Sequence, residues 1–332
     1  RPANGGPALM TPKLTVGRLL ERMRDTLELE QVAPASGLER LIENPNASSP
    51  GLVLAGYVDR FPAKRLQVLG ETEITYLKSL DPEIRRRNLE KFFSFPIPCV
   101  FITKGQEPGP DLCDIATASN VALIRSRLKT NEFYNQLKPW LEEEFAPTTN
   151  VHGSLADVFG VGLLFVGRSG IGKSECVLDL VERGHRLVAD DLVIVKRRGR
   201  DVLIGRGHEL QRHHMEIRGV GLVDIPGIFG VRAVRQQKRI EVVVQLEEWD
   251  HDAPIDRTGL DGEAKTILDV NVPMVRVPLN PGKNITVIAE VIAMNHLLKY
   301  SGVDPAERFN ERLMRQMRGR NDVARYLQED DE

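Results

Sequence analysis

The chain has 332 residues, of which 41% are hydrophobic and 28% charged, and its formal net charge is −2. A balance this close to neutral argues against a nucleic acid or a membrane surface as the partner. Because a single hydrophobic core stops growing at about 250–300 residues, the length predicts two domains. No apolar run approaches the ~20 residues of a membrane span, and the N-terminus lacks the apolar core of a signal peptide, so we expect a cytoplasmic protein.

Helical and strand patterns alternate in the first half of the chain. A helical period runs through 16–30, and helices are predicted again at 81–95 and 131–145. Short apolar runs predict strands at 51–58 and 97–105. This alternation predicts an α/β domain with a mostly parallel sheet.

A polar segment at 146–150 interrupts the alternation and is typical of a linker. We therefore expect the first domain to cover 1–147. Met10 is a candidate start of the natural chain, which makes 1–9 a candidate extension of this domain.

The second domain is expected over 148–320, followed by a disordered tail at 321–332. It opens with an apolar strand at 160–167 and a helix at 173–184 that Gly184 ends.

Farther along, strands are predicted at 185–197 and 239–249, and an apolar helix at 284–302. The segment 304–319 predicts an amphipathic helix with Asp304 as its N-cap. Two roles are open for this last helix: packing in the core, or contact with a partner.

The cysteines and a histidine cluster favour structural over metal-binding roles. The cysteines lack the CxxC spacing of a zinc or redox site, which favours small buried hydrophobes. They are Cys99, Cys113 and Cys176. His208, His213 and His214 lie close together without an acidic or thiol partner at metal spacing, which favours a solvated loop over a metal site.

The segment "GRSGIGKS" matches the phosphate-binding pattern G-x-x-x-x-G-K-[ST] at Gly167, Gly172, Lys173 and Ser174. It stands between a predicted strand and a predicted helix, as the mechanism requires. Backbone N–H groups and the helix N-terminus can surround phosphate oxygens, the lysine reaches the β/γ phosphates, and the serine hydroxyl ligates Mg²⁺. This pattern predicts a site for a nucleoside triphosphate.

Three classes remain open for such a loop: a switch GTPase, an ATP-driven motor and a kinase. The segment 222–227, "LVDIPG", resembles the D-x-x-G of a GTPase, but no N-K-x-D tetrapeptide follows it, which argues against that class. Asp190 and Asp191 follow Lys173 by 17 and 18 residues, closer than the acidic strand of a motor usually lies. An aspartate beside the γ-phosphate can accept the proton of an incoming hydroxyl, which favours a kinase, although a turn or a metal-ligating pair is the alternative.

Four segments in this order and spacing resemble one family: "VHG" with His152, "GRSGIGKSE", "VADD" and "MEIRGVGLVDI". The family is HPr kinase/phosphorylase, bacterial bifunctional enzymes that phosphorylate a serine of the phosphocarrier HPr and remove that phosphate by phosphorolysis. The resemblance covers about 148–320 and implies that this domain is a P-loop kinase domain. The first half is similar to the family only in its length and alternation.

The resemblance implies functional residues position by position. It implies catalytic roles for His152, Lys173, Asp191 and Arg257, and Mg²⁺ ligands at Ser174 and Glu216. The nucleotide-binding loop would be Gly167, Arg168, Ser169, Gly170, Ile171, Gly172, Lys173 and Ser174. The family signature would be Met215, Glu216, Ile217, Arg218, Gly219, Val220 and Gly221. The loop needed for dephosphorylation would be Pro278, Leu279, Asn280, Pro281, Gly282 and Lys283.

The implied reaction is a Mg²⁺-dependent phosphoryl transfer from ATP or pyrophosphate to HPr, carried out by a homohexamer in the regulation of carbon metabolism. Asp191 would accept the serine proton and return it in phosphorolysis. Each role has an ordinary alternative: His152 as a surface or core residue, Glu216 paired with Arg218, and Arg257 or "NPGK" as turns.

Two other functions remain open on the sequence. One is a nucleotide-sensing regulator that uses the same loop without transferring phosphate, and the other is a small-molecule kinase. A regulator should still pass on its conformational signal after Asp191→Asn, whereas the enzyme should lose phosphate transfer. A preference for metabolite hydroxyls over HPr would indicate the small-molecule kinase.

Overall fold

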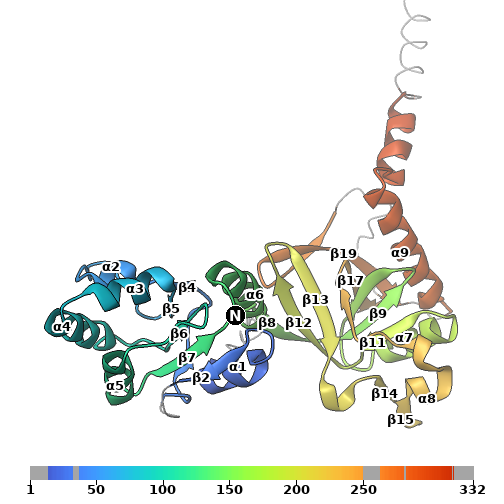
Figure 1. Ribbon diagram of the computed structural model, residues 1–332. Coiled ribbons are helices and arrows are strands. Elements are labelled where there is room, and N and C mark those ends of the chain that lie inside the picture. Colours follow the sequence, from blue (N-terminus) through green and yellow to red (C-terminus); the bar gives the residue numbers. More distant parts are fainter. Residues whose placement is uncertain (1–13, 33–36, 250–261, 280–281, 316, 318–332) are drawn as a thin grey trace, which may run out of the picture. The chain divides into compact units, whose positions relative to one another are not determined.

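The computed structural model describes residues 14–32, 37–249, 262–279, 282–315 and 317 (Figure 1). The chain divides into two compact units, with Ala146 and Pro147 on either side of the division. Met10 and the predicted tail at 321–332 lie outside the described residues. Among those described, no helix has both the length and the apolar character that a bilayer crossing requires.

The first unit contains a five-stranded sheet in the order β2-β7-β6-β5-β4. The four strands β4 to β7 are parallel, and β2 joins β7 antiparallel, which confirms the predicted α/β domain with a mostly parallel sheet. Its strands are β1 Leu14–Thr15, β2 Leu29–Gln31, β3 Leu41–Ile42, β4 Ala47–Ser48, β5 Leu66–Leu69, β6 Cys99–Ile102 and β7 Ala122–Ser126. Its helices are α1 Val16–Met23, α2 Gly51–Leu54, α3 Glu71–Ser79, α4 Pro82–Phe93, α5 Pro110–Ala118 and α6 Thr130–Glu144.

Strand β6 shows why the central strands of this sheet are continuous apolar runs in the sequence. Cys99 and Phe101 face a core shared with α1 and α6, whereas Val100 and Ile102 face a second core shared with α2 to α5. Helices on both faces leave no solvated side, so successive residues of a central parallel strand are all apolar.

Two predicted elements of this unit were wrong. Residues 51–58, predicted as a strand, contain the short helix α2, because a short apolar run does not distinguish a strand from a buried helical turn by its periodicity. Leu52 is 71% exposed while Val53 and Leu54 are buried. The predicted helix at 16–30 ends at Met23, because the residues after it form β2 and pair with the edge of the sheet at β7.

The second unit contains a six-stranded sheet, β11-β9-β10-β17-β19-β18, and a four-stranded sheet, β16-β13-β12-β8. Its first strands are β8 Thr148–His152, β9 Ser154–Val158, β10 Val161–Val166, β11 Arg186–Ala189, β12 Leu192–Arg198 and β13 Val202–Gly207. Its later strands are β14 His214–Ile217, β15 Gly221–Asp224, β16 Gln237–Arg239, β17 Val242–Glu248, β18 Ala264–Ile267 and β19 Val270–Leu279. Its helices are α7 Lys173–Glu182, α8 Ile225–Phe229 and α9 Ile285–Tyr300, with short 3₁₀ turns η1 Glu209–Gln211 and η2 Val231–Ala233.

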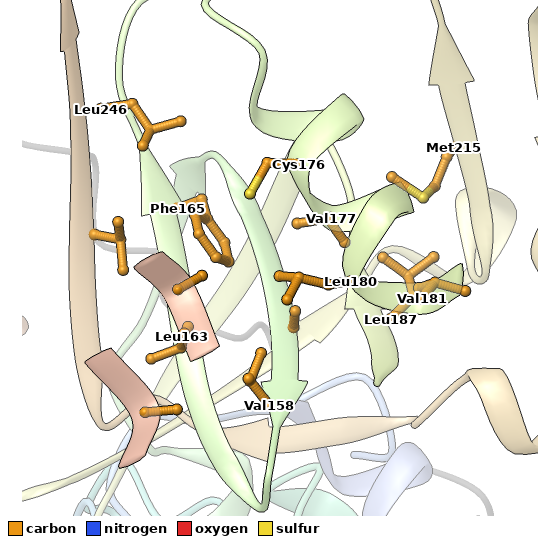
Figure 2. Packing of buried hydrophobic residues seen from close by; sticks show 14 of the residues in the cluster. Val158, Leu163, Phe165, Cys176, Val177, Leu180, Val181, Leu187, Met215 and Leu246 are labelled. Carbon is orange, nitrogen blue, oxygen red and sulfur yellow. The ribbon is translucent and has the colours of Figure 1, made fainter. Parts of the chain in front are cut away.

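This unit has three layers, with the six-stranded sheet in the middle (Figure 1). Along β10, Leu163 and Phe165 face α7 and α9, whereas Leu164 and Val166 face the four-stranded sheet. Figure 2 shows Phe165 directed toward Cys176 and Val177 of α7. Strand β10 is therefore buried on both faces, and it holds the loop that follows it on a rigid support.

The cysteines are free thiols, and two of them are small buried core residues, as predicted. Cys99 and Cys176 are buried and Cys113 is half-buried. Burial raises the pKa of the Cys176 thiol to about 12, so it is neutral at physiological pH. The described residues contain no group of three or more histidine, cysteine or acidic side chains placed to hold a metal.

The predicted helix at 304–319 is helical over 305–315, and Asp304 caps it by accepting a hydrogen bond from Ala306 N at 2.9 Å. Phe309 is 69% exposed, and Leu313 and Met314 are exposed as well. Packing in the core of its own chain is therefore not the role of the described part of this helix.

Candidate active site

The predicted phosphate-binding loop connects β10 to α7. Lys173, the first residue of α7, is only 6% exposed, and its Nζ donates hydrogen bonds to the carbonyl oxygens of Gly167 at 3.1 Å and Arg168 at 3.0 Å. No side chain caps the N-terminus of α7 at Gly172. The uncapped first-turn N–H groups and the lysine therefore lie at the same end of α7, which suits a phosphate group.

The predicted dephosphorylation loop begins at the same edge of the six-stranded sheet as the phosphate-binding loop. Strands β10, β17 and β19 are parallel, so their carboxyl ends meet at one edge of the sheet. Pro278 and Leu279 end β19 there, opposite Glu247 and Glu248 of β17. Arg168 of the phosphate-binding loop makes an ion pair with Glu248 at 2.8 Å.

The rest of the predicted dephosphorylation loop lies only partly within the described residues. Asn280 and Pro281 lie outside the described residues. Lys283 donates from Nζ to the carbonyl oxygen of Pro278 at 3.1 Å, which closes the base of the loop.

Asp190 connects the phosphate-binding loop to the strands beside it. Its Oδ1 accepts hydrogen bonds from Ser174 Oγ at 3.0 Å and from Ser154 Oγ at 2.5 Å. Burial raises the pKa of the Asp190 carboxyl group, and the two serine hydroxyls oppose this effect by stabilising the ionised form. A serine hydroxyl and a carboxylate thus lie side by side at the N-terminus of α7, an arrangement of hard oxygen ligands that suits Mg²⁺.

Asp191 and His152 meet because of strand register. Strand β8 ends at His152, which lies opposite Leu192, the first residue of its antiparallel neighbour β12. The residue before Leu192 is therefore next to His152, and His152 Nδ1 lies 3.2 Å from Asp191 Oδ1. Both side chains are more than half exposed, so the pair can be reached from solvent.

Asp191 also has an uncommon backbone conformation, with φ = 62°. Left-handed backbone is unfavourable for residues other than glycine, and it persists where the surroundings enforce it. Here Gly153 N donates to the Asp191 carbonyl oxygen at 3.0 Å. This bond helps to hold the turn in which Asp190 and Asp191 reach different partners.

The signature segment forms the hairpin of β14 and β15. Met215 and Ile217 are buried in the core beside α7, and the alternation of a strand turns Glu216 and Arg218 to the exposed face. The proposed pairing of Glu216 with Arg218 is not formed: among the described residues they share neither a hydrogen bond nor an ion pair. Arg218 instead lies against the phosphate-binding loop at Gly170.

A buried network fastens the far end of α7 to α9. Glu290 is 8% exposed and accepts hydrogen bonds from Arg183 Nε at 2.8 Å and Nη2 at 2.7 Å. His185 Nε2 lies 3.1 Å from Glu290 Oε1, the oxygen that also accepts the hydrogen bond from Arg183 Nε. The hydrogen bonds from Arg183 lower the pKa of the Glu290 carboxyl group, which keeps it ionised and α7 fixed at neutral pH.

The structure brings together most of the predicted site and adds two residues to it. His152, Asp191 and the loop with Lys173 and Ser174 lie around the same end of α7, whereas Arg257 lies outside the described residues. The sequence indicates Asp190 only as half of an acidic doublet, for which a turn or a metal-ligating pair is the alternative role. Ser154 carried no sequence signal, because its place beside Asp190 depends on the approach of β9.

Comparisons with known proteins cover nearly the whole chain. The model described as "HPr Serine kinase N terminus" matches residues 14–141, and that of the "HPr Serine kinase C-terminal domain" matches 143–313. A protein of Chloroherpeton thalassium named HPr kinase/phosphorylase is 43% identical, covering 93% of this chain and 92% of that protein. One of the same name from Geobacter sulfurreducens is also 43% identical, covering 92% and 95%.

A solved structure, the HPr(Ser) kinase/phosphatase from Coxiella burnetii, is 32% identical, with a TM-score of 0.44, and covers 49% of this chain and 99% of that one. The two family models and the curated relatives agree with the resemblance that the motifs predicted. The chain belongs to the HPr kinase/phosphorylase family.

Proposed function

We propose that this chain is a bifunctional enzyme that phosphorylates a serine of HPr and reverses that reaction by phosphorolysis. The observation that supports the proposal is that Asp191 directly follows the residue that contacts the phosphate-binding loop. Its neighbour Asp190 contacts Ser174 of that loop, and Asp191 itself contacts His152. A solvent-accessible carboxylate beside a phosphate site is what a general base for a protein hydroxyl requires.

In the forward direction Asp191 accepts the proton of the HPr serine as its oxygen attacks the terminal phosphorus of ATP or pyrophosphate. His152 Nδ1 orients the Asp191 carboxyl group, from which it lies 3.2 Å away. Lys173 exchanges the carbonyl oxygens of Gly167 and Arg168 for phosphate oxygens, since charged oxygens attract its ammonium more strongly. Arg257 is proposed as a further charged contact on family resemblance alone.

In the reverse direction the same carboxyl group, now protonated, acts as the acid. Inorganic phosphate forms a bond to the phosphorus of phosphoserine, the bond from phosphorus to the serine oxygen breaks, and Asp191 returns a proton to that oxygen. The products are serine and pyrophosphate. The loop 278–283 begins at the edge where this exchange takes place, which supports its proposed part in the reaction.

Ser174 and Glu216 are the proposed protein ligands of Mg²⁺, which neutralises charge on the transferred phosphate when bound. The local residues fit such an ion, because Ser174 Oγ and the Asp190 carboxylate supply hard oxygen ligands within 3.0 Å of each other. Glu216 lies on the exposed face of β14, the same face as Arg218, which contacts the phosphate-binding loop.

A homohexamer is proposed on family resemblance, and the exposed surface of the second unit supports self-association. Five aliphatic or methionine side chains of α9 are exposed, although the opposite side of the helix is buried. They are Val287, Val291, Met294, Leu297 and Leu298. Light scattering should report six times the mass of one chain, and a monomer would contradict this part of the proposal.

The decisive experiment mixes the chain with HPr, Mg²⁺ and either ATP or pyrophosphate, and detects phosphoserine by mass spectrometry. We expect one phosphate on HPr, and its removal with formation of pyrophosphate once inorganic phosphate is added. HPr with its target serine replaced by alanine is the control. Nucleotide binding without phosphoserine would indicate the sensing regulator instead, and transfer to metabolite hydroxyls in preference to HPr would indicate the small-molecule kinase.

A further inference from the structure

Arg218 lies directly over the phosphate-binding loop. Gly170 is the middle glycine of that loop, and a Cβ atom built on it would lie 2.5 Å from Arg218 Nη2, 2.6 Å from Nη1 and 2.8 Å from Cζ. Any side chain at this position would therefore displace the guanidinium group. Gly170 also has φ = 77°, a conformation that side chains other than that of glycine rarely adopt.

The position of Arg218 is set by a firmly held hairpin. Met215 and Ile217 anchor β14 in the core that contains α7. Val220 N donates to the Ile217 carbonyl oxygen at 3.0 Å and closes the turn that follows. Because β14 and the helix after the phosphate-binding loop share this core, the loop and Arg218 keep their relative positions.

The charge of Arg218 has no partner among the described residues: no carboxylate there forms an ion pair with it, and it lies on the exposed face of the hairpin. Arg168 in the same loop differs, because Glu248 neutralises it at 2.8 Å. An unpaired guanidinium beside uncapped helix N–H groups attracts an anion, and its planar fork matches two phosphate oxygens at once.

We propose that Arg218 binds the phosphoryl donor directly, as a second cation of the phosphate site beside Lys173. Its guanidinium contacts oxygens of the ATP or pyrophosphate held by the loop, and Gly170 is a glycine because the guanidinium occupies the space of a Cβ atom. This inference rests on the proposed function for the identity of the donor. It adds a role for Arg218 that its place in the signature segment does not specify.

The test measures pyrophosphate binding by calorimetry for the wild-type chain, Arg218→Ala, Arg218→Lys and the control Arg232→Ala. Arg232 is an exposed arginine of η2, outside both the phosphate-binding loop and the signature hairpin. We expect Arg218→Ala to weaken binding about 10- to 100-fold, the value of a charge-assisted hydrogen-bonded contact. Arg218→Lys should recover only part of this loss, because an ammonium lacks the bidentate fork, and the control should bind like the wild-type chain.

A double-mutant cycle tests the contact itself. Gly170→Ala should weaken pyrophosphate binding in both backgrounds, because φ = 77° strains an alanine in each, but the loss should be smaller in the Arg218→Ala background, where no guanidinium remains to be displaced. The melting temperature of Arg218→Ala should stay that of the wild-type chain, since an exposed side chain without a partner adds little stability.

Wild-type affinity for pyrophosphate in Arg218→Ala would overturn this inference and leave the proposed function intact. The opposite result, binding that depends on Arg218 in a chain that never phosphorylates HPr, would overturn the proposed function and leave the inference. Equal effects of Gly170→Ala in both backgrounds would also contradict the contact.

Discussion

Replacement of Asp191 by asparagine should lower the rate of HPr phosphorylation about 10²- to 10⁴-fold, which is the usual contribution of a general base. Asparagine has nearly the same shape as aspartate but cannot accept the serine proton. The affinity for ATP should change little, because the proposed phosphate contacts come from Lys173 and the N-terminus of α7, whereas the Asp191 carboxyl group lies against His152. Single-turnover transfer of labelled phosphate to HPr measures the rate, and calorimetry measures the affinity.

The matched control is Asp201→Asn, which changes an exposed aspartate in the turn between β12 and β13. It should leave both quantities unchanged. Phosphorolysis should fall together with phosphorylation in Asp191→Asn, because one carboxyl group serves both directions. A variant that lost only one of the two activities would show that Asp191 is not the shared acid and base.

Replacement of Phe165 by alanine should lower the unfolding free energy of the second unit by about 3–5 kcal/mol, the usual cost of removing a buried aromatic ring. Phe165 is fully buried in the strand that leads into the phosphate-binding loop, and Figure 2 shows its ring between β10 and α7. Neighbouring side chains would have to move to fill the cavity. Loss of this support should also shift the loop and weaken ATP binding.

Urea unfolding followed by Trp249 fluorescence isolates this unit when the other tryptophan, Trp140, is replaced by phenylalanine. Phe159→Ala is the matched control, because this ring is 51% exposed and touches His185 edge-on, with ring centroids 4.6 Å apart. Phe159→Ala should lower the unfolding free energy of the second unit by only about 0.5–1.5 kcal/mol. Equal losses in the two variants would mean that the core around β10 does not pack as tightly as the structure indicates.

The predictions that succeeded from sequence are those in which neighbouring residues decide the outcome. The segment with the phosphate-binding pattern lies between a buried strand and a helix, as predicted, because its spacing and glycine content are features of one continuous segment. The helix at 81–95 also agrees closely with α4, because Asp81 caps it and Pro82 occupies its first position. The parallel sheet of the first unit follows from a strand and helix alternation that leaves few other arrangements.

The errors arose where distant residues decide the structure. Residues 29–31 continue a helical pattern, but they form strand β2 because they pair with the free edge of β7. Residues 51–54 have an apolar composition that fits a strand or a helical turn equally well, and burial of Val53 and Leu54 under α4 and its neighbours selects the turn. In both segments tertiary contacts outweigh local propensity.

The sequence by itself determined that a segment with the phosphate-binding pattern joins a buried strand to a helix, and through four ordered motifs it determined the family. Those features lie within short segments whose residue types are dictated by chemistry. Only the tertiary structure decided that Asp190 contacts Ser154 and Ser174, that the register of β8 with β12 brings His152 to Asp191, and that Arg218 covers Gly170. These contacts join residues far apart in the chain, and their distances depend on strand register and core packing, which no single segment encodes.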